Sequence, residues 1–243
     1  MRTLILDIET VGESWDSLDA VTQSSLRAWI DRKVRTNEER EGLLTTVQNE
    51  LGLSPFTGRI VALGVYDLER AHGAVYYVGT GGESDEVVGD FILKNRSEAS
   101  LLEEFWEGAR EYDTFVTFNG RAFAMPYIIH RSLSHGIQPT QELMKYRYLT
   151  QQSMPYHIDV LDELTWYGAM RTRPTLHLLC RSYGITSPNL DGVQGTLVAN
   201  LFSKKQFRDI ALYNLKDVVA IKELYTVWLK NIAPVNFLAT LDF

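Results

Sequence analysis

The spacing of apolar and polar residues predicts β-strands at several points in the chain. Residues 3–9 contain the apolar run Leu4-Ile5-Leu6 and predict a buried strand. A turn at residues 54–58, which holds Pro55 and Gly58, precedes segments rich in β-branched residues. These later strands are predicted at residues 59–67, 74–79, 114–118 and 157–160. We expect the first three strands to form an antiparallel meander within a mixed sheet of about five strands.

Helical spacing of apolar residues dominates the second half of the chain. Helices are predicted at residues 99–111, 123–135, 175–183, 196–201 and 206–229. Residues 85–93 show no clear period and carry no assignment. Three strands, a helix, a strand and then mainly helices make a mixed α/β order, in which helices flank the sheet.

Residues 14–52 differ from the segments around them. They are rich in charge, lack proline, and carry apolar residues at roughly helical spacing, which predicts one or two amphipathic helices. The apolar positions are Leu18, Val21, Leu26, Trp29, Ile30 and Val34. We expect a helical insertion after the first strand, within a single domain that spans residues 1–243. Its role is either a structural cover or a substrate lid.

Composition indicates a folded protein of the cytoplasm. The chain has 243 residues, of which 45% are hydrophobic, so it can bury a full core and is not a disordered scaffold. No apolar run approaches the roughly 20 residues of a membrane span. The first residues lead directly into a strand, without the pattern of a signal peptide. The lone Cys180 cannot form an internal disulfide, which favours a reducing compartment, and its apolar neighbours indicate a core position.

Charge is distributed unevenly along the chain. The formal net charge of −7 argues against a general polyanion binder. Residues 1–116 carry 11 basic and 22 acidic residues, whereas residues 117–181 carry seven basic and four acidic residues. This second segment could place a local basic surface along a phosphate backbone, although a solvated charged face explains the charge equally well.

Two carboxylates end the first predicted strand. Asp7 and Glu9 are two residues apart, so their side chains project from the same face of the strand. Adjacent like charges are costly unless a cation holds them, and carboxylate oxygens suit a hard ion such as Mg²⁺ or Mn²⁺. By itself, the pair could also be two solvated acids at the end of a strand.

Two further groups of residues support a metal site. Tyr213 and Asp217 are four residues apart in the last predicted helix and share one of its faces. The surrounding helix is apolar, so Asp217 needs a partner. The second group is the segment 118–127, which begins Phe118-Asn119-Gly120-Arg121 after a predicted strand.

With these residues together, the chain resembles a 3′-5′ exonuclease of the DEDD superfamily, DEDDy branch. It is similar to the stand-alone exonuclease domains of the family B DNA polymerase type. Asp7-Ile8-Glu9-Thr10 matches the first family motif, residues 117–126 the second, and Tyr213-x-x-x-Asp217 the third. The resemblance covers the chain apart from residues 14–52. It implies a ribonuclease H-like fold, with a mixed sheet flanked by helices.

The second motif departs from the family pattern. Its aspartate position is occupied by Ala124, so one of the four expected carboxylates is absent, and the nearest acids, Asp113 and Glu142, lie off the motif. Two explanations compete. Ala124 is a substitution introduced to inactivate a nuclease, or the chain is a natural pseudo-nuclease that binds nucleic acid.

The resemblance also implies a mechanism and a set of site residues. Family members use two divalent cations, Mg²⁺ or Mn²⁺, about 4 Å apart. Asp7 would bridge both ions, Glu9 and Asp217 would bind the ion that activates water, and Tyr213 would orient that water. The residues expected to bind the substrate are Thr10, Asn119, Arg121, Phe123, Arg131, Arg173 and His177.

The expected substrate is the 3′ end of a single-stranded nucleic acid. DNA is favoured and RNA is possible, because no motif reports contacts near the 2′ position. The expected activity is 3′-5′ exonuclease activity, with this chain crippled by Ala124. A different ribonuclease H-like enzyme, such as an endonuclease, is a third interpretation.

Overall fold

The computed structural model describes residues 1–34, 36–81, 84–187, 194–234 and 237, and within them one sheet runs through the molecule. Its strands are β1 (Thr3–Gly12), β2 (Gly58–Asp67), β3 (His72–Tyr77), β4 (Glu86–Val88), β5 (Phe91–Asn95), β6 (Thr114–Thr117) and β7 (Tyr156–Asp159). Their order in the sheet is β4-β5-β3-β2-β1-β6-β7. The sheet is mixed: β1 pairs antiparallel with β2, and β2 pairs antiparallel with β3, as predicted. β1–β6, β6–β7 and β3–β5 are parallel pairs.

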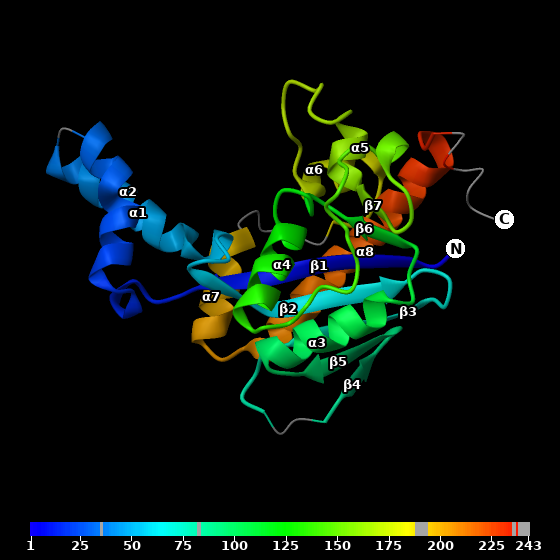
Figure 1. Ribbon diagram of the computed structural model, residues 1–243, viewed down its shortest axis with the longest axis horizontal. Coiled ribbons are helices and arrows are strands. Elements are labelled where there is room, and N and C mark those ends of the chain that lie inside the picture. The colour runs from blue at the N-terminus through cyan, green and yellow to red at the C-terminus, as the bar shows by residue number, and fades with distance from the viewer. Residues whose placement is uncertain (35, 82–83, 188–193, 235–236, 238–243) are drawn as a thin grey trace.

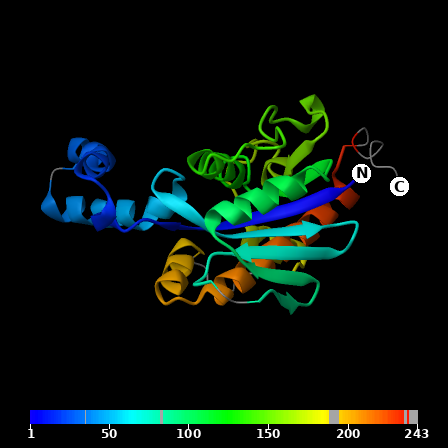
Figure 2. The ribbon, with the colours of Figure 1, turned by 60° about the horizontal axis from the view of Figure 1, so that its bottom comes forward.

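Helices cover both faces of this sheet. They are α1 (Ala20–Lys33), α2 (Asn37–Glu50), α3 (Glu98–Ala109), α4 (Ala124–Ser134), α5 (Val160–Leu164), α6 (Leu176–Tyr183), α7 (Gln194–Ser203) and α8 (Phe207–Asn231). In Figure 1, the long α8 runs behind β1 and β2, whereas α3 and α4 lie in front of them. Figure 2 shows the same two layers of helices from the side. The predicted α/β class, with a mixed sheet flanked by helices, is confirmed.

β1 is the centre of the fold because its two faces belong to two different cores. Leu4, Leu6 and Ile8 pack in the cluster formed with α3 and α4. Ile5 and Val11 pack in the cluster that contains the buried face of α8. Since side chains alternate along a strand, Asp7 and Glu9 must lie on the α8 face, between two apolar positions.

The strand count differs from the sequence-based expectation of about five. β4 and β5 form a hairpin over residues 86–95, most of which lie in the segment 85–93 that carried no assignment, and β5 then pairs with β3. Gly89 and Asp90 make the two-residue turn, with Gly89 at φ +57°. Glycine followed by Asp between β-branched and aromatic residues is a hairpin signal. The short length of β4 hid its alternation.

The segment between β1 and β2 is helical. Asp19 caps α1 by accepting from the backbone N–H groups of Val21 and Thr22, and Thr36 caps α2 in the same way. Figures 1 and 2 show most of α1 and α2 standing away from the sheet, and Val21 is 75% exposed. Ile30 and Leu51 of the same segment are buried, and its role as a structural cover or a substrate lid stays a prediction. That residues 1–243 form one exonuclease domain stays a prediction.

No helix in the described part of the chain combines the length and the apolar character that crossing a bilayer requires.

Gly64 of β2 sets the distance between the sheet and α8. A Cβ atom there would lie 2.8 Å from Val218 Cγ2 and closer still to Asn214 Oδ1, both on α8. We expect Gly64→Ala to lower the free energy of unfolding by about 1–3 kcal/mol, because α8 would have to move away from β2. Chemical denaturation measures this loss.

Gly42 provides the control, because it lies inside α2 and a Cβ atom added there would meet nothing within 4 Å. Gly42→Ala should raise the unfolding free energy by about 0.5–1 kcal/mol through helix propensity alone. Equal effects at the two glycines would contradict the close packing of α8 on β2.

Candidate active site

Three carboxylates from two distant parts of the chain meet between the sheet and α8. β1 carries Asp7 and Glu9, and α8 carries Asp217, which is 4% exposed. One oxygen from each of the three groups lies within 4.8 Å of the others. The sequence-based prediction that these residues share a site agrees with this geometry.

Burial raises the pKa values of all three carboxylates. Burial raises the pKa of Asp7 well above its ordinary value, and the charge of Asp217 raises it further. Burial likewise raises the pKa of Glu9, with added repulsion from Asp7 and Asp217. Burial raises the pKa of Asp217 to about 7. Without a counterion, the cluster therefore holds protons near neutral pH.

The residues present fit a hard divalent cation. Oδ1 of Asp217 is buried and has no hydrogen-bond partner within the described structure. A buried carboxylate oxygen without a donor is costly, and a cation would supply the missing interaction. All the candidate ligand atoms are carboxylate oxygens, which Mg²⁺ and Mn²⁺ prefer.

Asn214 supports the cluster from α8, and the motifs did not identify it. This residue is fully buried, and its Nδ2 donates to Asp7 Oδ2 at 3.1 Å. It reaches Asp7 because Gly64, the β2 residue opposite Asp7, has no side chain in the way. The available signal was a polar residue within an otherwise apolar helix, since a buried amide needs a partner.

A pocket of about 420 Å³ opens beside the carboxylates. Its lining includes Asp7, Glu9, Thr10, Asn119, Phe123, Arg173, Tyr213 and Asp217, all of which the sequence predicted as site residues. It also includes Ile8 and Phe118, which lie within the motifs without an assigned role, and residues outside the three motifs: Leu53, Leu161, Pro174, Thr175, Leu176, Val198 and Ile221. These are mainly apolar residues whose sequence pattern is that of ordinary core positions, so only their position in the fold reveals them.

The turn between β6 and α4 is held in place by Asp159. Oδ1 of Asp159 accepts from the backbone N–H groups of Asn119 at 2.8 Å and Leu161 at 3.1 Å, and Oδ2 accepts from that of Arg121 at 3.0 Å. Asn119 has φ +59°, and a Cβ on Gly120 would collide with Thr117. The Asn-Gly pair is therefore required to point Asn119 into the pocket.

Several predicted site residues do not line this pocket. Both guanidinium arms of Arg131 bind Glu98, at 2.8 and 2.7 Å, so this ion pair is structural. His177 Nδ1 bonds with Ser187 Oγ at 2.7 Å. Ala124 is the first residue of α4 and is 2% exposed. It packs in the core cluster that α3 and α4 form with β1. Arg121 lines a neighbouring pocket instead.

Cation binding should depend on pH. In the metal-free protein the raised pKa values mean that the protonated carboxylates favour the folded state at low pH. This contribution to stability is lost as the pH rises through the folded-state pKa of each group, which is about 7 for Asp217. A bound cation reverses the loss, so the stabilisation by Mn²⁺ should grow between about pH 5 and pH 8. The check is the difference in melting temperature between samples with Mn²⁺ and with a chelator.

This difference isolates the cluster from His157. Burial lowers the pKa of His157 to about 3, and its titration contributes equally with and without Mn²⁺. Asp217→Asn should flatten the pH dependence. A Mn²⁺ effect of the same size at both ends of the pH range would contradict the prediction.

Removing the Asn214 amide should weaken cation binding without removing a ligand. Asn214→Ala leaves Asp7 without its donor, and loss of such a supporting hydrogen bond typically costs about 10-fold in metal affinity. Isothermal titration with Mn²⁺ measures the change. The control is Asn231→Ala, which removes an exposed amide that donates to Val227 O at the far end of α8.

Comparison with known proteins places this chain in a family. Residues 72–238, more than half of the chain, match the family described as "Predicted 3'-5' exonuclease related to the exonuclease domain of PolB". This range includes Tyr213 and Asp217 and begins after Asp7 and Glu9. No curated protein matches the chain.

Among solved structures, the chain is similar to the family B DNA polymerase from the hyperthermophilic archaeon Pyrobaculum calidifontis. The TM-score is 0.57 at 15% sequence identity, over 94% of this chain and 24% of that chain. The chain thus spans about a quarter of that polymerase, and the likeness concerns the fold. On the family match, the chain belongs to the predicted 3′-5′ exonucleases related to the exonuclease domain of PolB.

Proposed function

We propose that this protein has the fold and the metal site of a 3′-5′ exonuclease. It binds the 3′ end of single-stranded nucleic acid, with DNA favoured over RNA. The observation that carries the proposal is the convergence of Asp7, Glu9 and Asp217 within 4.8 Å, beside a pocket that Tyr213 also lines. Family membership adds the reaction type. The proposed cofactors are two divalent cations, Mg²⁺ or Mn²⁺.

The residues of the pocket divide the work between chemistry and positioning. When bound, divalent cations would lower the pKa of the attacking water and neutralise charge that develops on the phosphate. Asp7, Glu9 and Asp217 would hold them. The Tyr213 phenol, one helical turn from Asp217, would orient the water by a hydrogen bond.

The 3′ end of the substrate would be held between polar and apolar side chains of the pocket. Asn119 would contact the terminal sugar, and Phe123 would stack against a base. Leu53 is 56% exposed at the pocket, where it gives a second apolar surface. Thr10 Oγ1 donates to Gly52 O at 2.7 Å, which fixes Leu53 and its neighbours against β1.

Ala124 defines what this chain lacks. With an aspartate at that position, the family's fourth carboxylate would help to hold the second cation; alanine offers no ligand. Removing a metal ligand leaves the charge that develops on the phosphate without compensation. We infer that the chain binds single-stranded nucleic acid while its catalysis is crippled, since Asn119, Phe123 and Arg173 line the pocket without the fourth carboxylate.

A second candidate function follows from the same position. Ala124 is 2% exposed and packs among apolar residues, as an alanine adapted to a core does. This favours a natural pseudo-nuclease that serves as a nucleic-acid-binding module. A cytoplasmic location belongs to both proposals and is supported by the single, buried Cys180.

Restoring the carboxylate tests the exonuclease proposal. Ala124→Asp should give Mn²⁺-dependent shortening of a 5′-labelled single-stranded oligonucleotide, with a rate increase of about 100-fold or more because charge stabilisation is restored. With a chelator present, the melting temperature of Ala124→Asp should be lower than that of the unaltered chain, because the introduced buried charge then has no partner.

Two controls accompany the restored variant. Ala124→Asn adds similar volume without a negative charge and should stay inactive, and Asp217→Ala should abolish the activity that Ala124→Asp gains. No gain of activity in Ala124→Asp would sink the exonuclease proposal and leave the pseudo-nuclease. Cleavage of a closed single-stranded circle would instead indicate an endonuclease.

A further inference from the structure

A second pocket, lined by Arg121, Ala122, Met144, Arg147, Asp162 and Arg173, adjoins the active-site pocket. Its volume is about 370 Å³. Three guanidinium groups line it together with a single carboxylate. Both oxygens of Asp162 are engaged by Arg147, at 2.9 and 2.7 Å, so this carboxylate neutralises one arginine only.

The other two arginines form no ion pair with an acid among the described residues. Arg173 donates to Asn119 Oδ1 at 2.6 Å, which is a neutral acceptor. Arg121 donates to the backbone carbonyl of Tyr146, and its buried Nε has no hydrogen-bond partner in the described structure. Asp159 and Asp162 stabilise the Arg121 charge from beyond ion-pair distance, yet a half-buried guanidinium without a directly bound carboxylate is costly, and an anion from outside would complete it. The second pocket is therefore built for a negatively charged group.

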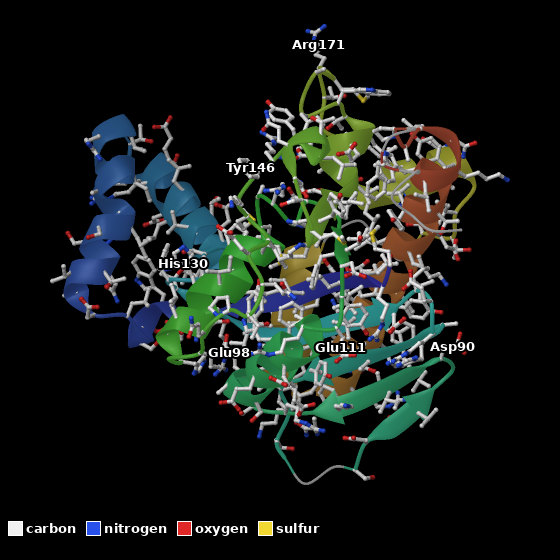
Figure 3. The ribbon with its side chains drawn as sticks, turned by 45° about the vertical axis from the view of Figure 1, so that its right-hand side comes forward. Asp90, Glu98, Glu111, His130, Tyr146 and Arg171 are labelled. Atoms are coloured by element: carbon white, nitrogen blue, oxygen red, sulfur yellow. The ribbon has the colours of Figure 1, made fainter. Side chains whose placement is uncertain are left out.

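Shared arginines join this pocket to its neighbours on both sides. Arg173 also lines the active-site pocket. Arg121 also lines a third pocket, of about 150 Å³, together with Lys145, Tyr146 and Glu142, whose carboxylate lies 3.9 Å from Lys145 Nζ. The three concavities thus form a row that begins at the carboxylates and ends at an exposed aromatic ring. Figure 3 labels Tyr146 and Arg171, which project outward from the part of the chain between α4 and α6.

The third pocket offers a surface for a base. Tyr146 is 44% exposed, and Lys145 Nζ lies 5.5 Å from the centroid of its ring. An exposed ring accepts a nucleobase by stacking, and a lysine ammonium beside it attracts phosphate. Single-stranded nucleic acid presents bases and phosphates alternately, at every nucleotide.

We propose that the row from Arg173 through Arg121 and Arg147 to Tyr146 is the track for the single strand upstream of its 3′ end. The second pocket takes a backbone phosphate, and the third pocket takes a base against Tyr146. The inference rests on the proposed function, because the 3′ end must enter the first pocket. It adds the direction of the strand and names Arg147, Lys145 and Tyr146 as binding residues.

The favoured occupant is single-stranded rather than a rigid duplex. The active-site pocket takes a free 3′ end and the exposed ring of Tyr146 takes an unpaired base, and a single strand offers both. Because contacts in the second pocket are to phosphate, they should be independent of base sequence and sensitive to salt.

Length-dependent binding tests the track without any catalysis. Fluorescence anisotropy is measured for 5′-labelled oligo(dT) of twelve and of three nucleotides, with Ca²⁺ present and at several salt concentrations. The short oligonucleotide fills the active-site pocket alone, whereas the long one reaches the second and third pockets. Arg121→Gln and Arg147→Gln are compared singly with the unaltered chain.

Arg121→Gln should weaken binding of the long oligonucleotide about fivefold or more and lower the salt slope by about 0.7, the value for one phosphate contact on a single strand. Arg147→Gln should weaken binding of the long oligonucleotide at least as much, because it also leaves the charge of Asp162 unpaired in the pocket. Binding of the short oligonucleotide should change less than twofold. Tyr146→Ala should weaken binding of the long oligonucleotide about fivefold or more, with the salt slope unchanged, because stacking releases no counterion.

Arg208→Gln is the matched control. Arg208 is 51% exposed, as Arg147 is, and it binds both oxygens of Glu86 at 2.8 and 2.6 Å. Glu86 lies in β4, at the opposite edge of the sheet from β7. This variant should bind both oligonucleotides as the unaltered chain does. Melting temperatures establish that each variant is folded, and Arg121→Gln leaves the Arg147–Asp162 pair intact.

The outcomes separate the track from the proposed function. Unchanged affinity and salt slope for the long oligonucleotide in both arginine variants would overturn the track, as would equal losses for the short and the long one. Neither result touches the nuclease, which is judged by hydrolysis in Ala124→Asp. Failure of the unaltered chain to bind the long oligonucleotide at low salt would also overturn the track.

Discussion

Mutual repulsion among three buried carboxylates is the constraint on which this structure depends. Asp7, Glu9 and Asp217 are brought within 4.8 Å of one another, where burial raises the pKa of all three and neighbouring charge raises the pKa of Asp7 and Glu9 further. A fold selected for stability alone would not place them there, because each group is cheaper in water. A bound cation would offset this cost. Asp217 Oδ1 has no hydrogen-bond partner among the described residues and would be available to such a cation.

The rest of the fold serves to hold this arrangement. β1 can place two acids toward α8 because its opposite face is packed beneath α3 and α4, so the strand is fixed from both sides. Gly64 lets α8 approach closely enough for Asn214 to reach Asp7. Asp159 holds the turn that carries Asn119 toward the same place. Rigid elements thus position ligand atoms that would otherwise move apart.

The sequence by itself determined the elements and the chemistry. Strong periodicity predicted the first three strands and the long last helix, since a buried face repeats every two residues in a strand and every 3.6 in a helix. The motifs around Asp7, Asn119 and Asp217 predicted a metal site, because few residue types bind a hard cation. The hairpin at Gly89 was not predicted because β4 is too short to show alternation.

Only the tertiary structure decided which residues share a pocket. Arg131 and Arg173 look alike in the sequence, yet Arg131 is bound to Glu98 while Arg173 lines the active site. Asn214 and Leu53 carry no motif and acquire a role only where β1, α8 and the segment before β2 meet. The physical reason is that a side chain's partners lie far away in the sequence, and only the packing of sheet and helices brings them together.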